Sequence, residues 1–236
     1  MGRIFETRKH TMMARFDKMA KAFTRIGREI VMAVKANGPL VENNPRLRTL
    51  IQNAKGVNMP KDRIDAAIKR AISKEDKDYE EVIYEGYGPY GVALLIETAT
   101  DNIYRTVADI RTIISRGGGA LGKTGSLDFI FTRKGVFKFL KGDLNIDELE
   151  LELIDFGADD VAISVEGEVY VYTSFQDFGM MQKALEDKNI NVLSTELQRI
   201  PNSFVEVTKE QEEEILLLIE KFEQNDDIQV VYHNMK

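Results

Sequence analysis

A glycine-rich stretch ending in a lysine and a threonine has the spacing of a phosphate-binding loop. Gly117, Gly122, Lys123 and Thr124 satisfy the Walker A pattern, in which backbone amides and the lysine hold phosphates at the start of a helix. Here a helical pattern precedes the glycines, and alternating apolar residues over 127–131 predict a strand after them. Because no helix would follow the lysine, we interpret the stretch as a tight helix-to-strand turn rather than a nucleotide site.

A second glycine pattern, at 86–91, matches the dinucleotide motif G-x-G-x-x-G. That motif needs a helix directly after it, whereas the apolar run at 92–97 predicts a strand. We therefore expect a connection between strands. Tyr84, Tyr87 and Tyr90 lie around this connection and are candidates for stacking on nucleic-acid bases, although aromatic residues at such turns more often pack the turn itself.

Carboxylates offer one route to catalysis. A two-metal nuclease needs several of them to converge in one pocket, and spacing alone does not show convergence. We keep a metal-dependent nuclease as a minor alternative, with these residues as its candidates: Glu97, Asp101, Asp109 and Asp128.

The sequence gives little support to catalytic or metal sites built from cysteine or histidine. The chain has no cysteine, which excludes disulfides and thiolate chemistry and fits a reducing compartment. Its two histidines, His10 and His233, stand at opposite ends of the chain. With no transmembrane run or secretory signal in the sequence, we predict a cytoplasmic, non-enzymatic protein with no catalytic residue, no metal site and no cofactor.

The charge is divided sharply along the chain. Residues 1–76 hold seventeen Lys and Arg against eight Asp and Glu, and residues 77–236 hold fifteen against thirty-one, which together make the 32 and 39 of the whole chain. The net charge of −7 thus hides a head of +9 and a body of −16. A basic module of this extent is typical of nucleic-acid binding, and the acidic body would repel the same ligand.

The head is predicted to be a bundle of three amphipathic helices preceded by a basic tail. Apolar residues recur at helical spacing over 16–37, then after Asn44 and Pro45, and again after Pro60. We predict that the nucleic-acid contacts come from the basic residues of this head: Arg8, Lys9, Arg15, Lys18, Lys21, Arg25, Arg28, Arg46, Arg48, Lys55 and Lys61. If six to ten of them contact phosphates of duplex DNA, the logarithm of the binding constant should fall with that of the salt concentration at a slope of about −5 to −9.

The body is predicted to hold two α/β domains, one inserted in the other. Residues 135–202 give strand–helix–strand–strand–helix–strand, the ferredoxin-like order. Residues 81–134 lack a helix and a strand, which 203–236 supply. We therefore predict an α+β protein of three domains: an N-terminal helical bundle over 1–76, a discontinuous α/β domain from 81–134 and 203–236, and an inserted ferredoxin-like domain over 135–202.

Five stretches resemble the YebC/PmpR family of bacterial regulators, which includes a mitochondrial translational activator. They are NPRLRTLIQNAKGVNMPKDRIDAAIKRA at 44–71, YEGYGPYGVALLIE at 84–97, TDNIYRT at 100–106, GGALGKTGSLDFIFTRKG at 118–135 and DDIQVVYHN at 226–234. The resemblance implies three domains, a cytoplasmic location and regulation of gene expression, with no enzyme activity or cofactor. Some family members act as DNA-binding transcriptional regulators and others on translation.

The opening of the chain departs from the family. Most members begin with a basic motif that contains tryptophan, whereas this chain has no tryptophan and keeps only the basic character of Arg8, Lys9 and His10. Contacts assigned to that motif therefore cannot be transferred to this chain.

Taken together, the residues and the resemblance predict a DNA-binding transcriptional regulator. The alternative is a translation factor that binds RNA or the ribosome, because the head has few Asn or Gln residues placed to read base edges. The acidic domains would position the head or hold a protein partner. The sequence indicates neither the target sequence nor the oligomeric state.

Overall fold

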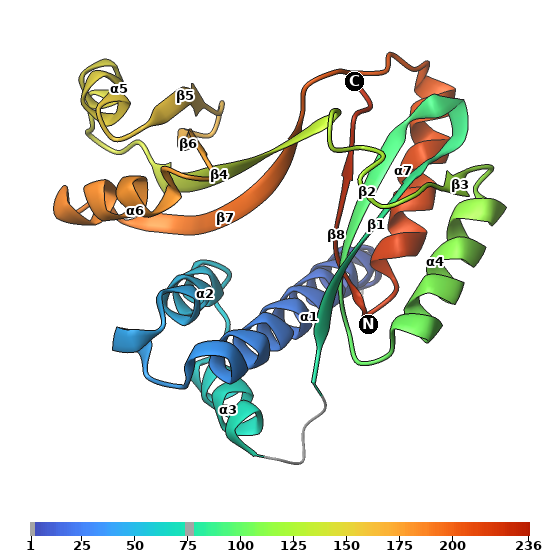
Figure 1. Ribbon diagram of the computed structural model, residues 1–236, viewed down its shortest axis with the longest axis horizontal. Coiled ribbons are helices and arrows are strands. Elements are labelled where there is room, and N and C mark those ends of the chain that lie inside the picture. The colour runs from blue at the N-terminus through green and yellow to red at the C-terminus, as the bar shows by residue number, and fades with distance from the viewer. Residues whose placement is uncertain (1–2, 74–77) are drawn as a thin grey trace. The chain divides into compact units, whose positions relative to one another are not determined.

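A computed structural model describes residues 3–73 and 78–236, with side chains described from residue 19 onward. Two compact units divide the chain between Glu80 and Glu81. The first unit is helical and the second combines helices with two four-stranded sheets. The predicted mixed α+β class is thereby confirmed (Figure 1).

The first unit contains the three predicted helices. They are α1 (Arg3–Asn37), α2 (Pro45–Gly56) and α3 (Lys61–Ile72), with a short 3-10 helix η1 (Val41–Asn43) before α2. Their apolar faces meet in one core, in which Ile30, Ala33, Leu47, Ala54 and Ala67 are fully buried.

The predicted start of the first helix, and the basic tail before it, were wrong. The backbone is already helical from Arg3. No proline interrupts residues 3–37, and Gly27 is the single glycine among them, so no local signal stops the helix.

The first sheet has the strand order β3-β1-β2-β8. Its strands are β1 (Glu80–Tyr87), β2 (Ala93–Thr100), β3 (Ala120–Leu121) and β8 (Ile228–His233). Helices α4 (Ile103–Arg116) and α7 (Lys209–Glu223) cover one face of it (Figure 1) and share a core with Leu94 and Ile96 of β2. A reciprocal capping box between Thr208 and Gln211 begins α7, at the Thr-x-x-Gln pattern that predicts such a cap.

The second sheet has the strand order β5-β6-β4-β7, which is the ferredoxin-like arrangement predicted for this segment. Its elements are β4 (Phe131–Leu140), α5 (Ile146–Ile154), β5 (Ala158–Ile163), β6 (Glu168–Ser174), α6 (Phe178–Asp187) and β7 (Val192–Pro201). Both helices pack on the same core, since Leu153 and Met181 are buried with Phe137, Phe139 and Val171.

The strand predicted over 127–131 was wrong. Residues 124–130 form a series of turns, and only Phe131 enters a strand, β4. Leu127 is buried but Phe129 is 73% exposed. The alternation of apolar residues here therefore comes from single side chains that enter the core, not from a strand paired in a sheet. Asn145 and Glu148 have the spacing that predicts a capping box, but the side chain of Asn145 makes no hydrogen bond to the start of α5.

The composition of the two sheets bears on how residues 81–236 are organised. The first sheet takes strands from before residue 122 and after residue 227, and the second takes all its strands from between them. On this basis we propose the division into a discontinuous domain and an inserted one. None of the described helices combines the length and the apolarity needed to cross a membrane.

Candidate nucleic-acid interface

The start of α2 is fixed to the end of α1 by a buried asparagine. The side-chain Oδ1 of Asn44 accepts a hydrogen bond from the amide of Leu47 at 3.0 Å, which caps the helix. Its Nδ2 donates to the carbonyl oxygens of Ala33 at 2.7 Å and Gly38 at 2.9 Å. Because the side chain is fully buried, these bonds set the position of the basic first turn of α2.

Arg48 is held by the loop before its own helix. Its Nη2 donates to the carbonyl oxygen of Glu42 at 3.1 Å, and the carbonyl oxygen of Val41 lies 3.5 Å away. Lys55 stands seven residues further along and is also exposed, so helical spacing places it on the same side of α2 as Arg48. Arg46, also exposed, lies on a different side of α2.

The predicted contact residues of α1 are only partly exposed. Lys21 and Arg25 are half-buried. The guanidinium of Arg28 lies 5.2 Å from the centre of the Tyr79 ring, and Lys35 forms a 2.7 Å ion pair with Asp78. The chain that leaves the helical unit therefore covers part of this basic stripe. The side chains of Arg8, Lys9, Arg15 and Lys18 lie outside the described residues.

Three exposed cations of α3 were missed by the sequence prediction, which named only Lys61 from this helix. Arg63 stacks on the ring of Phe23, 5.8 Å from its centre, and an ideal Cβ at Gly27 would lie 3.8 Å from Nη2 of Arg70. The third is Lys69. The signal was present, because Arg63 and Arg70 are seven residues apart and so share one side of α3, where it meets α1.

Amide side chains for reading bases are scarce on these helices. The sequence of α3 contains no Asn or Gln. Gln52 and Asn53 of α2 are half-buried, and both make contacts within the protein. The described surface of α2 and α3 is thus suited to phosphates more than to base edges.

The Walker-like stretch does not have the geometry of a phosphate site, because the amides of Gly117, Gly119 and Gly122 donate to backbone carbonyl oxygens and a carboxylate takes the amides just after the stretch. Glu85 is 5% exposed. Its side chain accepts hydrogen bonds from the amides of Gly125 at 2.8 Å and Leu127 at 2.7 Å, and from Oγ of Ser126 at 3.3 Å. Turns rather than a helix follow Thr124. The order of elements therefore differs from the Walker arrangement, as predicted, but the predicted helix-to-strand turn is only partly confirmed, because the strand that follows α4 is β3 (Ala120–Leu121), within the motif, and not 127–131.

The other glycine motif is a connection between strands, as predicted. A short 3-10 helix, η2 (Pro89–Gly91), joins β1 to β2. Tyr90 is 46% exposed, and its hydroxyl donates to Glu214 at 2.5 Å, which raises its pKa above the ordinary value. Tyr87 is 39% exposed. Tyr84 is half-buried, and its hydroxyl is buried without a hydrogen-bond partner.

The carboxylates proposed for a metal site do not converge. Oε1 of Glu97 lies 3.1 Å from Nε of Arg199, Asp101 pairs with Arg105 at 2.7 Å, and Asp109 accepts a hydrogen bond from Asn225. Among the side chains that the structure describes, from residues 19–73 and 78–236, no group of three or more acidic or histidine residues is placed to hold a metal ion.

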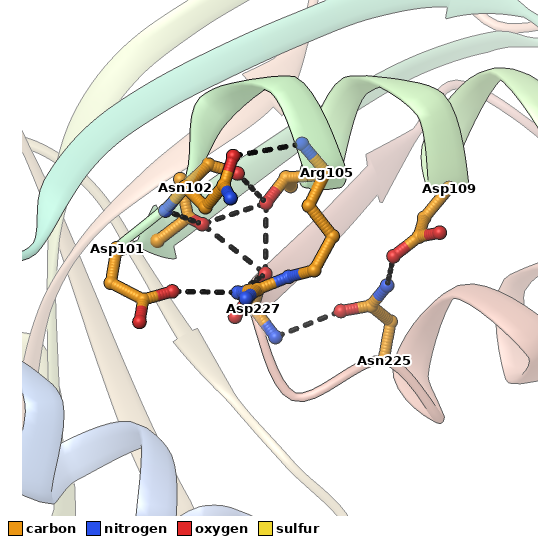
Figure 2. Close-up of polar contacts among 8 residues, drawn as sticks. Asp101, Asn102, Arg105, Asp109, Asn225 and Asp227 are labelled. Atoms are coloured by element: carbon orange, nitrogen blue, oxygen red, sulfur yellow. Dashed lines mark hydrogen bonds and ion pairs between the residues drawn. The ribbon is translucent and has the colours of Figure 1, made fainter.

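Asp101 belongs instead to a polar cluster that joins the start of α4 to the turn before β8 (Figure 2). Its centre is Asp227, which is 5% exposed. Oδ2 of Asp227 accepts hydrogen bonds from Arg105 at 2.8 Å, from Thr106 at 2.8 Å and from Thr100 at 3.2 Å. The bonds to Asp227 and then Asp101 raise the pKa of Arg105. The charged residues and the threonines of the TDNIYRT stretch belong to this cluster, and the carboxylates of Asp101 and Asp227 are both hydrogen-bonded to Arg105 within it.

His233, whose side chain the structure describes, is also poorly placed for catalysis. His233 ends β8, its Nδ1 is buried without a hydrogen-bond partner, and burial lowers its pKa. The side chain of His10 lies outside the described residues.

Comparisons with known proteins agree over nearly the whole chain. Residues 3–74 match the family model of the TACO1/YebC protein N-terminal domain, and residues 79–235 match that of the TACO1/YebC second and third domain. A probable transcriptional regulatory protein of Cytophaga hutchinsonii is 60% identical, covering 100% of this chain and 98% of the relative. One of Parabacteroides distasonis is 52% identical, covering 100% and 97%. The crystal structure of a conserved hypothetical protein from Aquifex aeolicus is similar with a TM-score of 0.81 and 35% identity, covering 92% of this chain and 90% of that one.

Proposed function

Because the chain belongs to the TACO1/YebC family, we propose that it is a non-enzymatic, nucleic-acid-binding regulator of gene expression that acts on transcription in the cytoplasm. The relatives named above are described as probable transcriptional regulatory proteins, which supports this choice. The observation that carries the proposal is the set of exposed cations on α2 and α3.

The electrostatics of the helical unit favour a polyanion. Residues 45–72 hold seven Lys and Arg against two Asp and Glu. Two of the arginines are held in place, Arg48 by carbonyl oxygens and Arg63 by an aromatic ring, so less side-chain freedom is lost when they contact a phosphate. The second unit carries most of the acidic residues and would be repelled by nucleic acid, which leaves it free to hold a protein partner.

The absence of enzymatic activity is supported by how the candidate catalytic groups are used. Glu85 takes the amides of Gly125 and Leu127, just after the Walker-like stretch, and Glu97 and Asp101 are held in ion pairs. We expect no cleavage of DNA or RNA by the full chain with Mg²⁺ or Mn²⁺. Metal-dependent cleavage that disappears in Asp101→Ala would show instead that the protein is a nuclease.

Binding through α2 and α3 can be tested with a charge reversal. Lys55 and Lys61 are exposed, so the double variant Lys55→Glu/Lys61→Glu should fold normally. On a fluorescent DNA duplex we expect weaker binding and a salt slope smaller in magnitude by roughly two. The matched control is Lys209→Glu/Lys221→Glu on α7, which makes the same change of charge in the acidic unit. If both variants lose affinity equally, the interface is not on the helical unit.

A translational role is the second candidate, and the scarcity of exposed amide side chains on α2 and α3 favours it. Backbone-directed binding suits structured RNA as well as duplex DNA. Competition between a promoter duplex and purified ribosomes at physiological salt separates the two. If the protein prefers the ribosome, and the Lys55→Glu/Lys61→Glu variant loses this preference, then the function is translational rather than transcriptional.

A further inference from the structure

Strand β1 has an outer edge that is paired at one end only. Strand β3 pairs with it at Gly86 and Tyr87, and the amide of Gly122 donates to the carbonyl oxygen of Glu85 at 2.8 Å. In the described part of the chain no strand continues this pairing toward the start of β1. The carbonyl of Val82 faces β2, where it accepts a hydrogen bond from Thr98. Because backbone groups alternate along a strand, those of Ile83 face outward.

A groove lies along this exposed edge. It has a volume of about 500 Å³ and is bounded by the edge of β1 on one side and by helix α4 on the other. The loop after β3 lies at its end, since Gly122 and Thr124 belong to its lining. An edge strand, a facing helix and a glycine-rich loop make a site into which an extended chain can add as a further strand.

Glycines in β1 and directly before β3 allow the two strands to lie close together. A Cβ at Gly119 would lie 2.3 Å from the carbonyl oxygen of Tyr87, and one at Gly86 would lie 2.6 Å from that of Ala120. Larger residues at these positions would push the loop away and open the end of the groove.

The lining of the groove mixes apolar and polar groups and carries the positive charge of Arg111, while the carboxylate of Glu85, which also borders it, is held by the amides of Gly125 and Leu127. Val107 and Leu121 supply apolar surface, and Arg111 and Ser115 supply polar groups from α4, whereas the side chain of Ile83 packs with Leu95 and Leu127. Arg111 is exposed. Residues 103–126 hold four Lys and Arg against one acidic residue, so this segment is locally basic within a strongly acidic unit. The groove is therefore complementary to an acidic partner.

We propose that this groove binds an extended, acidic segment of a partner protein, which adds as a strand to the outer edge of β1 and places a carboxylate against Arg111. The site lies in the second unit and goes beyond the nucleic-acid binding proposed for the helical unit. It gives the acidic unit a specific role as the part that holds a protein partner.

Two other occupants fit less well. A second copy of the chain, paired edge to edge about Ile83, would bring Glu81 opposite Glu85, and like charges directly opposite destabilise a sheet. A nucleic acid has no alternating amide and carbonyl groups to pair with a strand, and Glu85 already takes the amides of Gly125 and Leu127 that a phosphate would use.

The probe is a phage-displayed library of seven-residue peptides selected on the full-length protein. The selected peptides are then synthesised and labelled with fluorescein, and their affinity for the protein is measured by fluorescence anisotropy. We expect them to contain Asp or Glu and to bind the Arg111→Glu variant about tenfold more weakly. The control is Arg116→Glu, the same change at an exposed arginine of α4 outside the groove, which should bind like the unchanged protein.

A second measurement tests strand addition independently of any variant. Methylation of alternate backbone nitrogens of the peptide removes the donors that pair with β1, so binding should be lost while the side chains are unchanged. Hydrogen exchange at the amide of Ile83 should slow when the unmethylated peptide is bound. The proposal is overturned if the library yields no peptide, if methylation or Arg111→Glu has no effect on binding, or if a single-stranded oligouridylate binds the groove in their place.

Discussion

The buried carboxylate of Glu85 should be a main determinant of the fold around the glycine-rich loop. It receives two short backbone hydrogen bonds, from Gly125 at 2.8 Å and from Leu127 at 2.7 Å. Hydrogen bonds to a charged group each contribute about 1.5–3 kcal/mol, and an unpaired buried amide costs about 1–3 kcal/mol. Glu85→Ala should therefore lower the free energy of unfolding by about 3–5 kcal/mol.

Glu85→Gln separates the charge from the shape of this side chain. It keeps one acceptor oxygen but turns an NH₂ group toward a backbone N–H, so we expect a loss of about 2–3 kcal/mol, smaller than for Glu85→Ala. The matched control is Glu80→Ala, at an exposed glutamate of the same strand, which should change the unfolding free energy by less than about 0.5 kcal/mol.

Urea unfolding followed by circular dichroism gives these free energies, and native-state hydrogen exchange reports on the loop itself. In Glu85→Ala the amides of Gly125 and Leu127 should exchange faster than in Glu80→Ala. If Glu85→Ala costs less than about 1 kcal/mol, or if Mg-ATP stabilises the unchanged protein, then the carboxylate does not fill an anion site and the reasoning fails.

Three further results are expected in the second unit. Asp227→Ala leaves two threonine hydroxyls and a guanidinium without their shared acceptor and should cost about 3–5 kcal/mol in urea unfolding, while Asp226→Ala, at an exposed neighbour, should cost less than about 0.5 kcal/mol. Burial lowers the pKa of His233 in the folded protein, so on acidification the unfolded chain takes up the proton at a higher pH than the folded protein does. The free energy of unfolding should therefore fall as the pH drops below about 6.5. His233→Gln should reduce this pH dependence. Gly119→Ala places a Cβ 2.3 Å from a backbone oxygen and should cost about 1–3 kcal/mol, whereas Gly179→Ala, with nothing within 4 Å and a helical position, should stabilise by up to about 1 kcal/mol. Each expectation would be contradicted by one result: a lower unfolding free energy for Gly179→Ala, the same pH dependence of stability with and without His233, or equal losses of stability in Asp227→Ala and Asp226→Ala.

The sequence by itself determined the elements whose signals are local. The cap at Asn44 and the capping box at Thr208 depend on a few neighbouring residues, and the order of strands and helices over 135–202 follows from hydrophobic periodicity. The rejection of the Walker-like motif also followed from local order, since no helix could begin after Lys123.

Only the tertiary structure decided which distant groups meet. Glu85 and the amide of Leu127 are joined across about forty residues, and Arg105 meets Asp227 across 122, so neither contact leaves a trace in local spacing. The same holds for the cations, because a basic stripe on α1 gives no sign that Tyr79 and Asp78 will cover part of it. Charge along a chain determines the kind of partner, but which charges remain exposed to that partner is set by packing.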